Sequence, residues 1–291
     1  MSDLKRIHDV LIEAVLAGGT EVLRVKKTGL LDARFKHGKE LVTEADQRSD
    51  AAILAVFRSR FPEIDAGISF HLEESGEIGE STARRVGADP VDGTNHFACG
   101  GNLYAVQAHY VEDGLPLVGV VFQPEVYLPM DETAACVGRV VSAIRGEGAF
   151  TKRTTFEGDG FTVGESRSLR KNVLPQSGAF VACVPYGTKM APEDRERARR
   201  VHESGIISSM TGAASAGANV MMTIFGGQHV YANFGAGEDL DLIPPQVIAM
   251  EAGLTVWGVD RRPPVWHVRK QPVVFAPDER VAEMFLRAAG L

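Results

Sequence analysis

Hydrophobic positions in the first sixty residues recur every three to four residues, which is the period of an amphipathic helix. The first stripe predicts a helix that starts at Ser2 or Asp3 and runs to about Val25. The second stripe predicts a helix that Thr43 caps and that ends near Arg60. The chain is therefore expected to begin with a layer of two helices.

Further along the first half, apolar and polar residues alternate as they do in half-buried strands. Two such runs, 106–110 and 118–122, flank Asp113-Gly114, a pair that strongly favours a hairpin turn. A further strand region covers residues 134–150. We therefore expect an antiparallel sheet beside the two helices.

After residue 170, strands and helices alternate along the chain. The expected elements are a strand at 179–184, a helix at 192–204, a helix at 215–225, a strand at 230–232, a helix at 242–252, a strand at 272–275 and a helix at 279–289. We expect residues 152–172 to be a loop that forms a mobile or boundary segment. The chain then divides into an N-terminal α+β part, 1–170, and a C-terminal α/β part, 171–291, within one compact unit.

With 291 residues, the chain can bury a large core without disulfides or structural metals. Its 44% hydrophobic and 24% charged residues are typical of a globular enzyme, and no apolar run approaches the roughly 20 residues that span a bilayer. The chain starts with charged residues instead of an apolar signal, and its three cysteines are widely spaced, as in a reducing compartment. We expect a cytoplasmic protein with no membrane partner.

The net charge of −7 argues against a nucleic-acid polymer as partner, because such a partner requires a face of clustered Lys and Arg. The one basic run, Arg195 to Arg200, contains Glu196 and is expected to be a solvated helix face. An acidic protein can still bind a small phosphate ester if metal ions reverse the local charge. A site of that kind requires clustered carboxylates.

The segment from Asp89 to Thr94 has the sequence Asp-Pro-Val-Asp-Gly-Thr. Its proline has no N–H group, so we expect the preceding strand to end at Ala88 and to deliver both aspartates into an open turn. The glycine and threonine would then start a helix or turn whose free N–H groups face an anion, while the aspartates and the Val91 carbonyl face a cation. Taken alone, the segment is equally compatible with an ordinary acidic turn.

Other acidic segments surround this motif, and together they resemble the inositol monophosphatase family. In that family a Glu-Glu pair, the Asp-Pro-Ile/Leu-Asp-Gly-Thr motif, and a Trp-Asp that opens a helix ending in Glu-Ala-Gly follow in this order. The matching segments here are Glu73-Glu74, residues 89–94, Asp241 and residues 251–253, with Thr43 to Asp46, residues 146–150 and Ser215 to Asn219 as further matches. Asp241 precedes Glu251 by ten residues, the family's separation, which selects it over Asp239.

The resemblance covers nearly the whole chain and implies an α+β fold, the layered α-β-α-β-α sandwich with a mainly antiparallel first sheet, and a homodimer. It also implies a phosphatase that uses two or three Mg²⁺ ions, with Mn²⁺ as an alternative. The implied metal ligands are Glu73, Asp89, the Val91 carbonyl, Asp92 and Asp241. The implied catalytic residues are Asp46, Thr94 and Glu73. The implied substrate contacts are Gly93, Thr94, Ser215 and Ala216.

The chain departs from inositol-specific members of the family at the leaving-group pocket. Seven positions before the metal aspartate it has Phe234 in place of an acidic residue, and this ring cannot accept hydrogen bonds from a polyol but could stack on a base or sugar of the substrate. Leu240 replaces a tryptophan, and His96 replaces an asparagine. The substrate is therefore open between an inositol or sugar phosphate and a 3′-phosphorylated nucleotide.

These departures also motivate a hypothesis from another class, a non-catalytic regulatory protein of the same fold that binds metal or phosphate. For Asp46 and Thr94, helix capping is a competing role. A protein of this fold that has lost turnover usually lacks metal ligands or the residues that activate water, whereas this chain retains both sets. Hydrolysis is therefore the preferred hypothesis.

Overall fold

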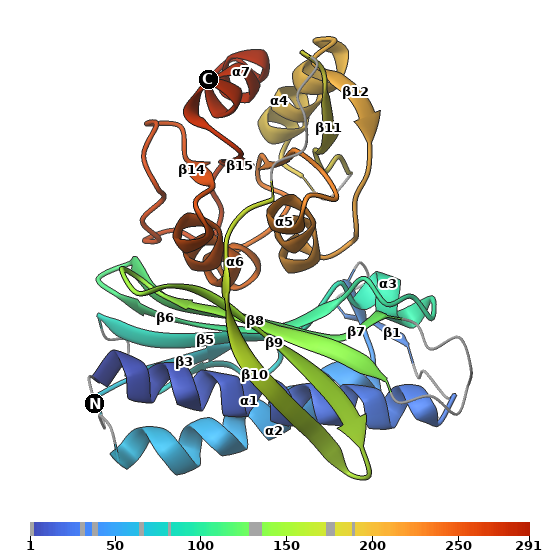
Figure 1. Ribbon diagram of the computed structural model, residues 1–291, viewed down its shortest axis with the longest axis vertical. Coiled ribbons are helices and arrows are strands. Elements are labelled where there is room, and N and C mark those ends of the chain that lie inside the picture. The colour runs from blue at the N-terminus through green and yellow to red at the C-terminus, as the bar shows by residue number, and fades with distance from the viewer. Residues whose placement is uncertain are drawn as a thin grey trace.

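The computed structural model describes residues 3–29, 33–36, 40–63, 67–80, 83–127, 136–172, 178–187 and 190–291. Helices and sheets alternate in five layers from one end of the molecule to the other (Figure 1). The order is α1 with α2, an eight-stranded sheet, α5 with α6, a five-stranded sheet, and α4 with α7. The α+β layered sandwich expected from the sequence is confirmed.

The helices of the described chain fall close to the predicted positions. They are α1 (Asp3–Lys27), α2 (Glu44–Arg60), α3 (Thr94–Ala98), α4 (Pro192–Glu203), α5 (Ala216–Phe225), α6 (Asp239–Ala252) and α7 (Glu279–Ala289), with a short 3-10 helix at Phe61–Glu63. Thr43 caps α2, as predicted. None of these helices is both long and apolar enough to cross a membrane.

The large sheet has the strand order β10-β9-β8-β7-β6-β5-β3-β4 and is antiparallel except between β3 and β5. Its strands are β3 (Ser69–Leu72), β4 (Gly76–Ile78), β5 (Arg84–Asp92), β6 (Ala105–Glu112), β7 (Leu115–Tyr127), β8 (Val137–Ile144), β9 (Gly148–Glu157) and β10 (Gly160–Leu169). The predicted hairpin is formed by β6 and β7, and both residues of its Asp113-Gly114 turn have positive φ.

The small sheet has the order β12-β11-β13-β15-β14, and β1 pairs only with β2 within the described residues. These strands are β1 (Arg34–Lys36), β2 (Glu40–Val42), β11 (Phe180–Cys183), β12 (Ile207–Met210), β13 (Val230–Asn233), β14 (Thr255–Trp257) and β15 (Val273–Ala276). The sequence pattern did not predict the three- and four-residue strands β14 and β12. Such short runs carry too few positions to show alternation.

Alternation of buried side chains explains why both sheets are covered on both faces. On β13, Val230 and Ala232 enter the core with α4 and α7, whereas Tyr231 enters the core with α6. This middle core also contains Val121 of the large sheet and Ile248 of α6. This core therefore joins the large sheet to α6, and the division of the chain into 1–170 and 171–291 within one compact unit stays a prediction.

Two predictions for the first half are wrong. The strand does not end at Ala88, because β5 continues to Asp92 and absorbs Pro90 in a bulge, where its pairing with β6 shifts between Asp89 and Asp92. Residues 152–172 are not a loop, because most of them lie in β9 and β10. β10 is an edge strand with mostly exposed residues, so it lacks the alternation that would have revealed it. Part of the predicted strand region, residues 134 and 135, lies outside the described residues.

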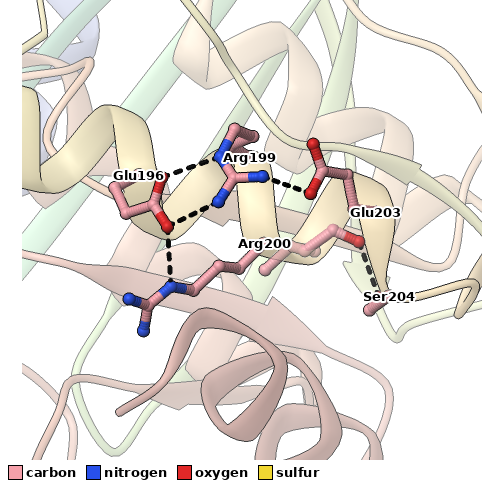
Figure 2. A network of polar contacts seen from close by, with 6 residues as sticks. Glu196, Arg199, Arg200, Glu203 and Ser204 are labelled. Atoms are coloured by element: carbon pink, nitrogen blue, oxygen red, sulfur yellow. Dashed lines mark hydrogen bonds and ion pairs between the residues drawn. The ribbon is translucent and has the colours of Figure 1, made fainter.

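The run from Arg195 to Arg200 lies on α4, where Glu196, Arg199 and Glu203 form a chain of ion pairs on the surface (Figure 2). These side chains are 39% to 61% exposed. The predicted solvated helix face is confirmed for Arg199 and its partners, whereas Arg195 and Arg197 of the same run are partly buried.

Candidate metal centre

Three aspartates from distant parts of the chain meet at one point. Asp89 and Asp92 come from the end of β5 and Asp241 from the first turn of α6, and one carboxylate oxygen of each lies within 4.8 Å of the others. Residues three apart on a regular strand face opposite sides of the sheet. The bulge at Pro90 inserts one extra residue, so Asp89 and Asp92 can turn to the same side.

The start of α5 binds the carboxylate of Asp92. The Ser215 hydroxyl donates to Asp92 Oδ2 at 2.7 Å, the Ala216 N–H to Oδ1 at 3.0 Å and the Gly217 N–H to Oδ2 at 2.7 Å. A Cβ on Gly217 would lie 3.0 Å from Asp92 Oδ2 and 2.7 Å from Gln107 Oε1, so only glycine permits this approach. Ser215 and Ala216, predicted as substrate contacts, line the pocket but use these donors to hold a metal ligand.

The helix predicted at residues 242–252 begins three residues earlier, at Asp239, so Asp241 lies inside it. Glu238 is the N-cap, and Asp241 is the third helical residue, whose Oδ2 accepts the Glu238 N–H. Pro244 and Pro245 therefore lie inside α6. Pro245 has no N–H to donate to the carbonyl of Asp241, four residues before it, and that carbonyl accepts a hydrogen bond from Gln107 Nε2 at 3.2 Å instead.

Asp46 and Thr94 are brought together as predicted. The Thr94 hydroxyl lies 2.9 Å from Asp46 Oδ1 and 3.0 Å from the Val91 carbonyl, and Asp46 Oδ2 accepts the N–H and hydroxyl of Thr43 at 2.8 and 2.7 Å. Burial raises the pKa of Asp46, and the hydrogen bonds from Thr43 and Thr94 partly oppose that shift. Asp46 thus caps α2 through one oxygen and contacts Thr94 through the other.

Gly93 provides the sharp turn between β5 and α3, with φ +100. A Cβ there would lie 2.9 Å from the Ser215 side chain, so the position requires glycine on both counts. The predicted helix start at Gly93 and Thr94 is confirmed, because Thr94 is the first residue of α3. Both residues line the pocket that contains the aspartates.

Glu73 follows β3, and its N–H donates to the Ala88 carbonyl at 3.3 Å, so β5 fixes its position next to Asp89. Its exposed side chain lines the same pocket, and its charge contributes to the raised pKa of Asp89. The Val91 N–H donates to Asp89 Oδ1 at 2.9 Å, and the Val91 backbone lies at the pocket beside Thr94. All five residues predicted as metal ligands therefore border one pocket.

The carboxylates of this pocket repel one another. Burial, followed by the charges of Glu73, Asp92 and Asp241, raises the pKa of Asp89 well above its ordinary value. Burial and the charge of Asp241 raise the pKa of Asp92 to about 7, although its three donors oppose the shift. A divalent cation would remove this repulsion, and a set of oxygen atoms suits a hard cation such as Mg²⁺ or Mn²⁺. The residues present therefore fit a metal centre.

The pocket has a volume of about 280 Å³. Beyond the residues already described, its lining is made of Asn95, Pro185, Ala213, Ala214, Asn219, Tyr231, Asn233, Ala236 and Gly237. Within the described chain, no lysine or arginine lines it. The described side chains around the carboxylates are thus uncharged, and Tyr231 is the largest of them.

Phe234 is the predicted site residue that the structure does not bring to the pocket. Its ring is fully buried in the core between the small sheet and the layer of α4 and α7. His96 does not line the pocket either. The neighbouring Asn233, which the sequence reading missed, does line it, and its Oδ1 accepts the N–H groups of residues 235, 236 and 237. An Asn followed by Phe-Gly-Ala-Gly is the turn signal that could have indicated this role.

Comparison with known proteins supports the family resemblance. The chain is 34% identical over 125 residues to an inositol-1-monophosphatase of Synechocystis, a match that covers 42% of each chain. It is 30% identical over 193 residues to a fructose-1,6-bisphosphatase/inositol-1-monophosphatase of Thermotoga maritima, covering 66% of this chain and 61% of that one. The matched segments thus span less than two thirds of these relatives' lengths.

The fold matches that of the crystal structure of the extragenic suppressor protein SuhB from Bartonella henselae, with a TM-score of 0.74, 19% identity and coverage of 97% of both chains. The sequence profile of the inositol monophosphatase family matches residues 3–289, which is nearly the whole chain. The match in sequence, the fold and the cluster of aspartates agree: this chain is a member of the inositol monophosphatase family.

Proposed function

We propose that the protein hydrolyses a small phosphate monoester in a Mg²⁺-dependent reaction. The observation that carries this proposal is the cluster of Asp89, Asp92 and Asp241 next to the hydrogen-bonded pair of Thr94 and Asp46. One group is suited to hold divalent cations and the other to accept a proton from water. Membership of a family of metal-dependent phosphomonoesterases supports the same activity.

The metal ligands would be Glu73, Asp89, the Val91 carbonyl, Asp92 and Asp241. Bound Mg²⁺ ions would neutralise the phosphoryl oxygens and lower the pKa of a bound water. The Thr94 hydroxyl has one hydrogen, and when it donates to Asp46 its lone pairs can accept a proton from the attacking water. Burial, which raises the pKa of Asp46, favours proton uptake by this carboxylate. Gly93 and Thr94, at the start of α3, would contact the phosphate.

The pocket walls favour a monoester with an uncharged polar leaving group, such as a sugar or an inositol. A second phosphate, as in a sugar bisphosphate or a 3′,5′-bisphosphate nucleotide, needs cationic side chains, and no lysine or arginine lines the described pocket. The burial of Phe234 removes the ring that could have stacked on a base or a sugar. We therefore rank the bisphosphates below the monophosphates.

Phosphate release from a panel of esters tests both the activity and the ranking. The panel contains inositol 1-phosphate, aldose phosphates, histidinol phosphate, fructose 1,6-bisphosphate and adenosine 3′,5′-bisphosphate, each with and without Mg²⁺, beside Asp92→Asn. We expect Mg²⁺-dependent release from a monophosphate that Asp92→Asn abolishes. Faster release from either bisphosphate would overturn the ranking. Mg²⁺ binding without release from any ester would replace the proposal with the non-catalytic regulatory protein.

The homodimer implied by the resemblance stays a prediction. Light scattering on an eluting size-exclusion peak tests it directly, since a dimer has twice the chain mass of 31.4 kDa. A mass of one chain at micromolar concentration would contradict it.

A further inference from the structure

The first turn of α6 carries the metal ligand Asp241 and is attached to the large sheet by two polar contacts. One is the hydrogen bond from Gln107 of β6 to the Asp241 carbonyl. The other is an ion pair two residues earlier, in which Arg85 Nη2 of β5 lies 3.0 Å from Asp239 Oδ2. The donors of the two contacts lie on adjacent strands, β5 and β6. Their acceptors on α6, Asp239 and Asp241, flank Leu240.

The carboxylate of the ion pair, which α6 supplies, is buried. Asp239 is 2% exposed, and its other oxygen, Oδ1, accepts the N–H of Leu240. His71 Nδ1 lies 4.0 Å from the same oxygen, beyond hydrogen-bond distance, so Arg85 at 3.0 Å is the closer partner of Asp239. A carboxylate this far from water is costly without such a partner.

The first turn of α6 also packs directly against the backbone of β5, next to Arg85. Gly87 follows Arg85 on the same face of β5, and a Cβ there would lie 2.9 Å from a methyl group of Leu240 and 2.3 Å from the ring of His109. Leu240 can approach the backbone this closely only because residue 87 has no side chain. Asp241 is therefore held against the sheet with little freedom to move.

We propose that Arg85 is a positioning residue for the metal centre: by holding Asp239 it fixes the first turn of α6 and so places Asp241 for Mg²⁺ binding. The inference rests on the proposed function, because it concerns the same metal site. Arg85 and Asp239 line a separate cavity of about 390 Å³ that shares no lining residue with the metal pocket. Their effect on the metal therefore passes through the helix.

Mg²⁺ binding to the Arg85→Met protein tests the inference, measured by isothermal titration calorimetry without substrate. Loss of a positive charge near the centre would, by electrostatics alone, tighten Mg²⁺ binding. Loss of positioning should instead raise the Mg²⁺ Kd by about 10- to 100-fold. Turnover at saturating Mg²⁺ should recover to near the wild-type rate, because the ligands themselves remain.

Arg84→Met is the matched control. Arg84 is the preceding residue on β5, is 42% exposed, and contacts Tyr110 and Glu112 instead of α6. It removes the same charge without touching the helix, so we expect the wild-type Kd or a slightly lower one. Arg85→Lys, which can still pair with Asp239, should restore most of the affinity.

The outcomes separate this inference from the proposed function. If the wild-type protein itself binds no Mg²⁺, the proposed function fails and the inference with it. If the wild type binds Mg²⁺ and Arg85→Met binds it as tightly or more tightly, only the inference is overturned. Should Arg85→Met not fold, as judged by circular dichroism in EDTA, Asp239→Asn carries the test, and a wild-type Mg²⁺ Kd in that variant would overturn the inference. If both single variants fold, effects on Kd that simply add in the Arg85→Met/Asp239→Asn double variant would also overturn it, since two partners of one pair must be coupled.

Discussion

The surface of α4 and the metal centre both concentrate charge, but they combine it differently. On α4, Glu196 contacts Arg199 and Arg200, each three or four residues away, so neighbouring charges have opposite sign and face water (Figure 2). At the metal centre, Asp89 and Asp92 meet Asp241, and all three charges have the same sign.

The pKa values follow this difference. Hydrogen bonds from Arg199 and Arg200 lower the pKa of Glu196 to about 2, whereas burial and neighbouring carboxylates raise the pKa of Asp89 well above its usual range. On α4, each charge is neutralised by a neighbouring side chain of opposite sign. At the metal centre, the negative charges can be neutralised only by bound cations. Removing one charge should therefore have opposite effects on the stability of the metal-free protein in the two places.

The largest expected effect is that of Asp241→Asn. Turnover should fall by about 10³-fold, since a metal ligand contributes several kcal/mol to transition-state stabilisation. In EDTA, however, the variant should melt about 2 °C or more above wild type, because it removes one of the repelling charges. Scanning calorimetry checks this, with Asp159→Asn, a change at a fully exposed carboxylate, as the control for charge. A lower melting temperature than wild type in EDTA would contradict the comparison.

Thr94→Val should have the next largest effect, because it removes the hydroxyl between Asp46 and the pocket while keeping the size of the side chain. We expect kcat to fall by about 10²-fold, the lower end of general acid–base contributions, with the Mg²⁺ Kd unchanged. Thr94→Ser keeps the hydroxyl and should retain most of the activity. Equal losses in the two variants would show that the hydroxyl is not the group on which turnover depends.

A smaller effect is expected on the pH dependence of stability without metal. Because folding raises the pKa of Asp92 to about 7, the folded state binds more protons than the unfolded state between about pH 4 and 7. The contribution of this group is fully present below about pH 4 and is lost as the pH rises to about 7. The melting temperature in EDTA should fall across that window, and saturating Mg²⁺ should flatten the slope. A slope that Mg²⁺ leaves unchanged would assign the titration to other groups.

The sequence predicted that Asp89, Asp92 and Asp241 come together, because two of them share one motif and the third follows in the order of the family. Asp89 and Asp92 share one motif, and Thr43 is a recognisable cap. Asp46 and Asp241 play the same local part, since each is the third residue of its helix and accepts the N–H of the N-cap with one oxygen. The other oxygen remains for the site, although the helix predicted at 242–252 did not reveal this position for Asp241.

Predictions failed where tertiary packing decided the outcome. Phe234 lies one residue after β13, and only the small sheet's core reveals that its ring points away from the pocket. The role of Gln107, whose amide replaces a helical donor that Pro245 lacks, depends on contact between segments more than a hundred residues apart. The use of the α5 start to bind Asp92 depends on packing of the same kind. No local pattern contains that information.

The smallest effect is expected on α4, where Arg199→Ala removes ion pairs to both Glu196 and Glu203. These side chains face water, so solvent and salt screen their attraction and the side chains lose entropy when they are held in place. The melting temperature should change by less than about 2 °C, and both kcat and the Mg²⁺ Kd should stay at their wild-type values. The change alters the net charge by one, as Asp241→Asn does in the opposite direction, so the pair of variants isolates the effect of location. A large loss of stability in Arg199→Ala would mean that the exposed network holds α4 in place, and the contrast with the metal centre would then rest on packing instead of charge.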